Sequence, residues 1–225
     1  MTTRTNRIKG IIFDMDNTLL QSSIDFPAMK QDVFRHLVAA GVLPRLFPVQ
    51  DHTTATLLEA AKHAGISDSL YEELLAVAVK HELAGMEGAG LEPGAEELLA
   101  QLHGSFVLAV VTNNAWPAAQ KALEETGIIR YFDLVAGREQ MTSLKPSPSG
   151  FLYVKGQFPD IAEDEWLSVG DSWIDGKGSA DANIPFVCYR TPRQIMDQRG
   201  VPAIGRIEKL EDLLPYIQPS GKPRR

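Results

Sequence analysis

The sequence contains only one cysteine, Cys188, among its 225 residues. An intrachain disulfide is therefore excluded, and a chain of this length can bury enough surface to fold without disulfides or a structural metal. Cys188 lies in the apolar run 185–189, where we expect it to act as a small apolar residue of a strand. A reducing, cytoplasmic compartment is the expected location.

Long apolar runs are also lacking. The basic segment 1–9 is followed by only Ile11, Ile12 and Phe13 before an aspartate interrupts the run. A signal peptide or a membrane-spanning helix needs a longer uncharged stretch. We therefore expect neither, and no membrane partner.

Positive charge is scarce. The chain has 22 Lys and Arg against 29 Asp and Glu, a formal net charge of -7. Because nucleic acids are bound by clustered Lys and Arg, we expect no nucleic-acid partner. The one basic cluster lies at 219–225, a polar segment rich in helix breakers that we expect to be a flexible tail. A monomer and a weak homodimer are equally compatible with this charge.

Five short apolar runs of strand length stand out instead. They do not alternate with polar residues, which is typical of parallel strands covered on both faces. Helical patterns separate the last four runs, so the expected fold class is α/β, a doubly wound, Rossmann-like parallel sheet. The runs are 8–13, 106–111, 132–136, 166–169 and 185–189.

The interval between the first two runs is far too long for one crossover helix. It contains three amphipathic patterns: one from Asp25 to Gly41, one over 52–64, and one over 70–83 capped by Ser67 or Asp68. We expect an inserted α-helical cap at 21–92, with a core at 1–20 and 93–225. Four glycines would make the second connection flexible, namely Gly85, Gly88, Gly90 and Gly94.

Polar residues follow the apolar runs at the edge where a parallel sheet carries its ligand site. Clustered aspartates there need a cation, and oxygen ligands without His or Cys select magnesium over zinc. A phosphoryl group is the anion that suits a nucleophile, a metal and a lysine together. The residues are Asp14, Asp16, Thr18, Thr112, Asn113, Lys145, Asp171 and Asp175.

Each motif alone has an ordinary interpretation. Asp14-x-Asp16 could form a calcium loop or a turn, and Thr112-Asn113-Asn114 is common turn chemistry. Lys145 could be a solvated loop lysine, and the segment 170–172 could cap a helix. Their order and their placement at strand ends carry the interpretation.

That order resembles the haloacid dehalogenase superfamily, and within it phosphoglycolate phosphatase-like members with a helical cap, over Ile8 to about Tyr189. The resemblance implies that Asp14 attacks phosphorus, forms an aspartyl-phosphate and binds Mg²⁺. It implies that Asp16 protonates the leaving group, activates water and binds the metal through its carbonyl. Further roles are implied at other positions: phosphoryl and substrate binding by Thr112, Asn113 and Lys145, metal binding by Asp171, and support of the metal's water shell by Asp175.

Asp16 also narrows the reaction. Carbon–halogen dehalogenases of this superfamily lack the second aspartate, whereas an alkoxide leaving group benefits from an acid. The predicted function is hydrolysis of a small phosphate monoester, with a small phosphorylated metabolite as partner. A phosphosugar mutase, a receiver-type phosphoryl-binding module and a catalytically silent interaction protein stay as alternatives.

Several other residues are assigned ordinary roles. Lys30 and Arg35 are expected to face solvent, although they could meet substrate, as could Ser22 and Asp25. Trp116 and Trp173 could line the pocket, with packing as the alternative. Gly176 and Gly178 are expected to fray the helix after Asp175, and Asn183 to end it in the left-handed conformation. The five histidines are expected to be structural: His36, His52, His63, His81 and His103.

Overall fold

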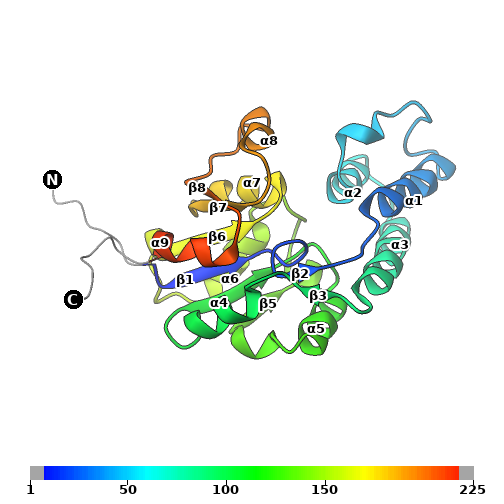
Figure 1. Cartoon of the computed structure of the whole chain (residues 1–225). Coiled ribbons are helices and arrows are strands. Elements are labelled where there is room, and N and C mark those ends of the chain that lie inside the picture. Colours follow the sequence, from blue (N-terminus) through cyan, green and yellow to red (C-terminus); the bar gives the residue numbers. More distant parts are fainter. Residues whose placement is uncertain (1–7, 218–225) are drawn as a thin grey trace, which may run out of the picture.

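The apolar runs of the sequence form one parallel sheet. The computed structural model describes residues 8–217, and its six-stranded sheet has the order β5-β4-β1-β6-β7-β8 (Figure 1). Every neighbouring pair is parallel, with β1 in the centre between β4 and β6. The strands are β1 (Gly10–Phe13), β4 (Val107–Val111), β5 (Leu134–Ala136), β6 (Trp166–Gly170), β7 (Phe186–Tyr189) and β8 (Gly205–Ile207).

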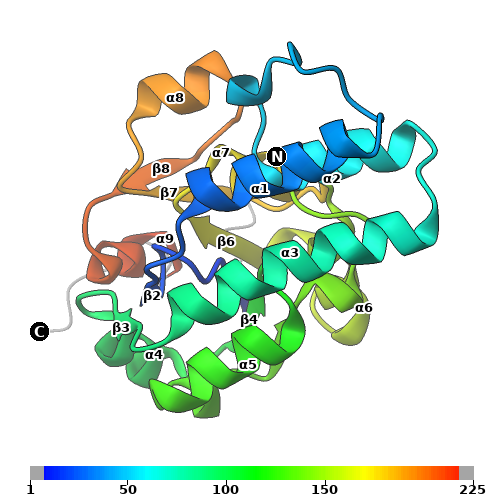
Figure 2. The same cartoon turned by 90° about the vertical axis from the view of Figure 1, so that its right-hand side faces the viewer.

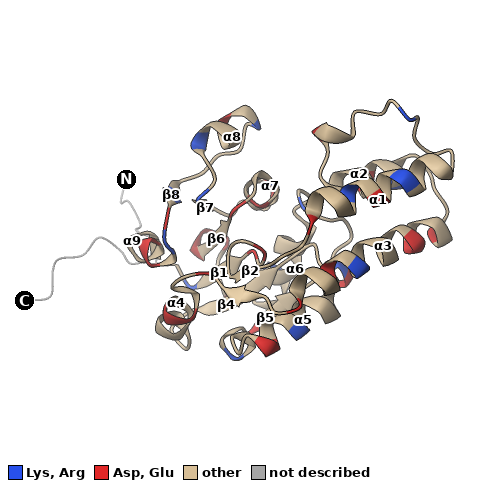
Figure 3. Cartoon of the chain, turned by 45° about the vertical axis from the view of Figure 1, so that its right-hand side comes forward, with Lys and Arg blue, Asp and Glu red and all other residues tan. Residues whose placement is uncertain are grey.

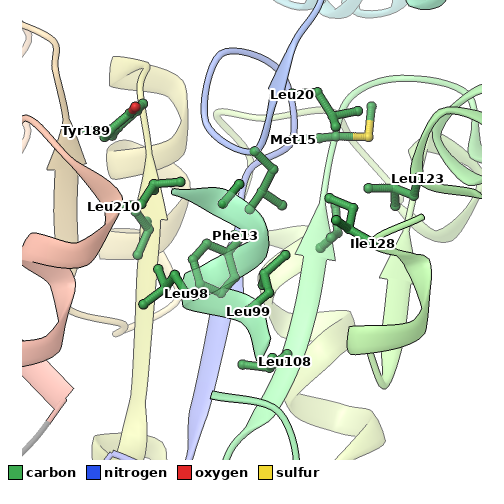
Figure 4. Close-up of a cluster of buried hydrophobic side chains, with 14 of the residues drawn as sticks. Phe13, Met15, Leu20, Leu98, Leu99, Leu108, Leu123, Ile128, Tyr189 and Leu210 are labelled. Carbon is green, nitrogen blue, oxygen red and sulfur yellow. The ribbon is translucent and has the colours of Figure 1, made fainter. Parts of the chain in front are cut away.

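Helices cover both faces of this sheet. Ile11 and Phe13 point into one apolar cluster with helices of the first layer, and Figure 4 shows Phe13 among leucines from these elements. Ile12 points to the opposite face and packs with Phe151 and Val154. The first layer contains α4 (Ala95–Leu102), α5 (Trp116–Glu125), η5 (Leu210–Leu213) and α9 (Leu214–Ile217), and the second contains α6 (Ser149–Gln157) and α7 (Trp173–Asp181). The predicted α/β class and all five predicted strands are confirmed.

The edge strand β8 was not predicted. It is three residues long, Gly-Arg-Ile, and offers no apolar run to recognise. Its pairing with β7 places Ile207 opposite Tyr189, which extends the sheet by one strand. The short helix α8 (Arg193–Gln198) lies between β7 and β8.

Three helices form a separate layer beyond the sheet, and they lie in front of it when seen from their own side (Figure 2). They are α1 (Phe26–Ala39), α2 (Thr54–His63) and α3 (Asp68–Met86). Each begins at a side chain that accepts a backbone N–H, namely Asp25, Thr53 and Ser67. The three helices share their own apolar cluster around Val33, Leu37, Leu57 and Leu74. We call this layer the cap.

Two adjacent segments join the cap to the sheet. β2 (Leu20–Gln21) and β3 (Gly90–Leu91) pair antiparallel, so the chain enters and leaves the cap side by side. Gly85 belongs to α3, and a Cβ there would lie 2.4 Å from the Cα of Ile24. It is therefore a point of close packing and not part of a connecting segment, contrary to expectation. The predicted division at residues 20 and 92 stays a prediction, and the predicted tail 219–225 lies outside the described residues.

The glycines of α7 also serve close packing. A Cβ at Gly176 would lie 2.4 Å from Val201, and one at Gly178 would lie 2.8 Å from Phe151. The helix is continuous from Trp173 to Asp181, so the expectation that it frays is wrong. Asn183 has a φ of 58°, which confirms the predicted left-handed end.

Charged residues of both signs are interspersed along the helices of the cap and the sheet layers (Figure 3). Within residues 8–217, no helix combines the length and apolar character needed to cross a membrane. Cys188 is buried in β7, as predicted, and burial raises the pKa of its thiol to about 11.

Candidate active site

The polar residues converge because of how the strands are ordered. From β1 the chain continues to β4 and β5 on one side, then crosses to β6 and β7 on the other. Phe13, the last residue of β1, is in register with Val110 and Val169 of its two neighbours. The residues after these strands therefore meet at the switch point of the sheet, where open α/β sheets bind ligands.

Asp14 lies at the centre of this meeting point. Its backbone N–H donates to the carbonyl of Val169 at 2.9 Å, which continues the sheet by one residue. Its side chain is only 10% exposed. Lys145 Nζ donates to Oδ1 at 2.6 Å, and Thr18 Oγ1 donates to Oδ2 at 3.1 Å. Both carboxylate oxygens are thus held in place by donors.

Lys145 is a buried cation and not a solvated loop residue. Besides Asp14, its Nζ donates to Asp175 Oδ1 at 2.7 Å and to the carbonyl of Val111 at 2.8 Å. Burial lowers the pKa of this ammonium, but the charges of Asp14 and Asp175 outweigh burial and raise the pKa above its ordinary value. Lys145 therefore carries its charge at neutral pH.

The two residues that follow Thr112 hold other parts of the site. Asn113 Oδ1 accepts the backbone N–H of Lys145 at 2.7 Å, and its Nδ2 donates to the Lys145 carbonyl at 3.1 Å. Asn114 Nδ2 donates to Asp16 Oδ2 at 2.7 Å. The substrate-binding role of Asn113 stays a prediction, and the sequence pattern predicts no role for Asn114.

Asp16 is a buried carboxyl with an unusual affinity for its proton. Burial, with a further contribution from the negative charge of Asp14, raises its pKa to about 7, against smaller lowering effects of Ser22 and Asn114. A carboxyl of this kind can both give and take a proton near neutral pH.

Three carboxylates form a cluster that could hold a metal ion. Asp14, Asp171 and Asp175 each offer an oxygen, and these oxygens lie within 4.8 Å of one another. Burial, followed by the negative charge of Asp14, raises the pKa of both Asp171 and Asp175 above the ordinary value. A bound cation would relieve this repulsion, and a set of oxygen donors without His or Cys fits a hard divalent ion.

Asp175 has little freedom within the cluster. Its Oδ1 accepts from Lys145, and its Oδ2 accepts the backbone N–H of Ser172 at 3.0 Å. A Cβ at Gly170 would lie 2.7 Å from the Asp175 carboxylate, so only glycine leaves room for it. This arrangement agrees with a supporting position for Asp175.

A cavity of about 360 Å³ lies between these residues and the cap. Thr112, which is 1% exposed, and Asp171 line its core side. On the cap side the lining includes Lys30 and His52, so Lys30 lies at the cavity and does not face bulk solvent as expected. The lining does not include the other residues that could meet substrate or line the pocket, namely Ser22, Asp25, Arg35, Trp116 and Trp173.

The cap contacts the core through two carboxylates, of which Glu82 is buried and Glu59 is half-buried. Glu82 of α3 is 3% exposed and lies 2.5 Å from Arg138 Nη2 through each of its oxygens. It also accepts the backbone N–H of Ala115 at 3.1 Å. Glu59 of α2 accepts the N–H of Leu144, next to Lys145, at 3.1 Å. These contacts cannot be predicted from the local sequence pattern, because Glu on an amphipathic helix usually faces solvent.

The fold and the site together define an α/β enzyme with a covered cavity at the switch point of a parallel sheet. At its centre the carboxylate of Asp14 is hydrogen-bonded to the buried Lys145. The carboxyl of Asp16 and the aspartate cluster that could bind a metal lie beside them. Carboxylates, a fixed cation and an acid–base group are components that group-transfer chemistry can use.

Comparisons with known proteins identify the class further. Residues 11–189 match the family described as haloacid dehalogenase-like hydrolase, and the chain belongs to this family. The phosphoglycolate phosphatase of Rhodobacter capsulatus is 30% identical over 192 residues, which cover 80% of this chain and 83% of that protein. The predicted superfamily and hydrolase class are thereby confirmed.

Solved structures show the same fold. A HAD-superfamily hydrolase of subfamily IA from Geobacter sulfurreducens has a TM-score of 0.62 and 24% identity, covering 97% of this chain and 100% of its own. The HAD-hydrolase YfnB from Bacillus subtilis, bound to magnesium, has a TM-score of 0.63 and 21% identity. The match covers 94% of this chain and 99% of the YfnB chain.

Proposed function

We propose that this chain is a magnesium-dependent phosphatase that hydrolyses a small phosphate monoester through an aspartyl-phosphate on Asp14. The observation that carries the proposal is the position of Asp14 on the wall of the cavity, with its carboxylate bonded to Lys145 and with Asp16 two residues away. Phosphoryl transfer depends mainly on such positioning and on charge stabilisation.

The two half-reactions use the two aspartates differently. A carboxylate oxygen of Asp14 forms a bond to phosphorus while the ester P–O bond breaks, and the leaving alkoxide takes the proton of Asp16. Water then attacks the same phosphorus, Asp16 takes back a proton, and the bond to Asp14 breaks to release phosphate. The raised pKa of Asp16 suits both its acid and its base role. Thr112 and Lys145 hold the phosphoryl oxygens.

The metal would be held by the side chains of Asp14 and Asp171 and the backbone carbonyl of Asp16, with Asp175 as support. When bound, Mg²⁺ offsets the negative charge of the carboxylates and of the phosphoryl group. The protein's own part is to orient Asp14 through Lys145 and Thr18, so that one oxygen faces phosphorus. The magnesium in the Bacillus subtilis neighbour agrees with this choice of metal.

The names of several relatives support a small anionic substrate. Proteins named phosphoglycolate phosphatase match from Rhodobacter capsulatus and Cereibacter sphaeroides. A cavity of about 360 Å³ suits an ester of that size. A cytoplasmic location and a monomer or weak homodimer stay predictions.

The test is phosphate release from a panel of small phosphate esters, with Mg²⁺ or with EDTA, by wild type and Asp14→Asn. We expect Mg²⁺-dependent release by the wild type and a loss of several orders of magnitude in the variant. Borohydride reduction during turnover should convert Asp14 to homoserine, detected by peptide mass spectrometry. Equal activity of the two proteins would contradict the nucleophile, and sugar-phosphate interconversion without phosphate release would indicate a mutase.

A further inference from the structure

The loop after β7 reaches the backbone of the aspartate cluster. Thr191 lies two residues beyond the end of this strand, and its Oγ1 donates a hydrogen bond to the backbone carbonyl of Asp171. The two loops meet because β6 and β7 are paired up to Gly170 and Cys188, just before the bonded residues. Thr191 also lies outside residues 11–189, the part of the chain that matches the family. Its contact with Asp171 is therefore not part of the matched pattern.

Asp171 is the member of the cluster whose side chain is not held directly. The carboxylates of Asp14 and Asp175 each accept two hydrogen bonds, one of them from Lys145 in both cases. Within residues 8–217, no hydrogen bond reaches the carboxylate of Asp171. The direction of this carboxylate is therefore set by the backbone that carries it.

The peptide unit between Asp171 and Ser172 is held at both of its polar groups. Its carbonyl accepts from Thr191, and its N–H donates to Asp175 Oδ2 at 3.0 Å. Because a peptide unit is planar, two such bonds fix its rotation and the position of the adjoining Asp171 Cα, from which the carboxylate projects. Without the Thr191 hydroxyl, the carbonyl would lose its donor and the unit would be held on one side only.

Thr191 is itself braced by the edge strand β8. Arg206 Nε donates to the carbonyl of Thr191 at 2.7 Å, and Arg206 Nη2 donates to the carbonyl of Arg190. Arg190 has a φ of 57°, a left-handed conformation that residues other than glycine rarely adopt. Such a conformation persists where the surrounding structure holds it. The turn at 190–191 thus has one fixed shape, which determines where the Thr191 hydroxyl lies.

We propose that Thr191 is a positioning residue that holds Asp171 in the orientation for binding the metal. The inference rests on the metal-binding role of Asp171 in the proposed function. A ligand that is already oriented raises affinity, because less order has to be imposed when the ion binds. A hydroxyl that only satisfies a carbonyl would instead affect the stability of the fold and leave the affinity for Mg²⁺ unchanged.

The test compares Thr191→Val, which removes the hydroxyl and keeps the branched shape, with Thr191→Ser, which keeps the hydroxyl. Isothermal titration calorimetry with Mg²⁺ and without any ester measures the affinity directly. Thr191→Val should bind Mg²⁺ about 10-fold more weakly than the wild type, and Thr191→Ser should stay within about twofold of it. The Mg²⁺ concentration for half-maximal phosphate release should rise in parallel, while kcat at saturating Mg²⁺ changes by less than about threefold.

Thr126→Val is the matched control. The Thr126 hydroxyl also donates to a backbone carbonyl, that of Ala122 at 2.7 Å, and Thr126 is not among the residues that line the cavity. Its loss should leave the affinity for Mg²⁺ unchanged. If Thr191→Val does not fold, Arg206→Met tests the same link, because it removes the brace on Thr191 and should weaken Mg²⁺ binding by about threefold.

Three outcomes decide against parts of this scheme. Wild-type affinity for Mg²⁺ in the folded variant, or an equal loss in Thr191→Ser, would overturn the positioning role. A wild type that binds Mg²⁺ but hydrolyses no phosphate ester would overturn the proposed function and leave the positioning role standing. A wild type that binds no Mg²⁺ would overturn both.

Discussion

The side-chain amide of Asn114 donates a hydrogen bond of 2.7 Å to Oδ2 of Asp16, across 98 positions of the sequence. Asn114 is 4% exposed, so this bond is made away from water. It holds the carboxyl of Asp16 in one orientation, and Asp16 lines the cavity beside Asp14.

Asn114→Ala should therefore act through Asp16. We expect kcat for an alkyl phosphate to fall by about 10-fold or more, because the carboxyl loses the donor that orients it. The loss for p-nitrophenyl phosphate should be smaller, since its leaving group departs without a proton. Steady-state kinetics with both esters, alongside Asp16→Asn, measures the difference. Equal losses on the two esters would show that Asn114 does not act through the acid.

The acidic cluster predicts an effect of magnesium on stability that is independent of turnover. Mg²⁺ should raise the Tm of the wild type relative to EDTA, because it binds the folded protein and relieves repulsion among Asp14, Asp171 and Asp175. In EDTA, Asp171→Asn should melt above the wild type, since burial and neighbouring charges disfavour that carboxylate. Adding Mg²⁺ should raise the Tm of Asp171→Asn by less than it raises the Tm of the wild type. An equal Mg²⁺ shift in both proteins would place the metal elsewhere.

The sequence was informative where the chemistry is local to one strand end. Asp14, Lys145 and Asp171 follow apolar runs, so their meeting could be predicted once the runs were assigned to a parallel sheet. Lys30 could not be placed in the same way. Its contact with His52 depends on how α1 and α2 pack, and a charged position on an amphipathic helix favours solvent by default.

Buried partners were missed for a related reason. Glu82 and Arg138 are 56 positions apart, and neither shows in its local pattern that the other will neutralise it. The glycines of α7 were misinterpreted for the opposite reason. Helix propensity penalises them, whereas the close contacts of Gly176 with Val201 and of Gly178 with Phe151 leave no room for a Cβ. Such features are decided by packing between elements, and a local pattern does not contain that information.

Two glycines in helices offer a matched test of that packing. Gly176→Ala should lower the free energy of unfolding by about 1–3 kcal/mol, because the new Cβ would meet Val201 and Phe186. Gly156→Ala in α6 meets nothing within 4 Å and should raise it by about 0.5 kcal/mol through reduced entropy of the unfolded chain. Urea unfolding of both variants measures the pair. Similar values for the two would show that the α7 contact is not tight.

The buried pair Glu82–Arg138 predicts how stability depends on pH. Burial raises the pKa of Glu82 above its ordinary 4.5, although Arg138 lowers it. The folded protein therefore holds this proton more tightly than the unfolded chain. Its contribution to the free energy of unfolding is fully present below pH 4.5 and is lost as the pH rises through the folded pKa.

Urea unfolding of the wild type and Glu82→Gln at a series of pH values measures this contribution. The free energy of unfolding of the wild type minus that of Glu82→Gln should decrease as the pH rises from 4.5 through the folded pKa, and should then stay constant. Glu87→Gln, at an exposed position near the end of α3, controls for the loss of one charge. A difference that grows with pH would mean that the attraction to Arg138 outweighs burial.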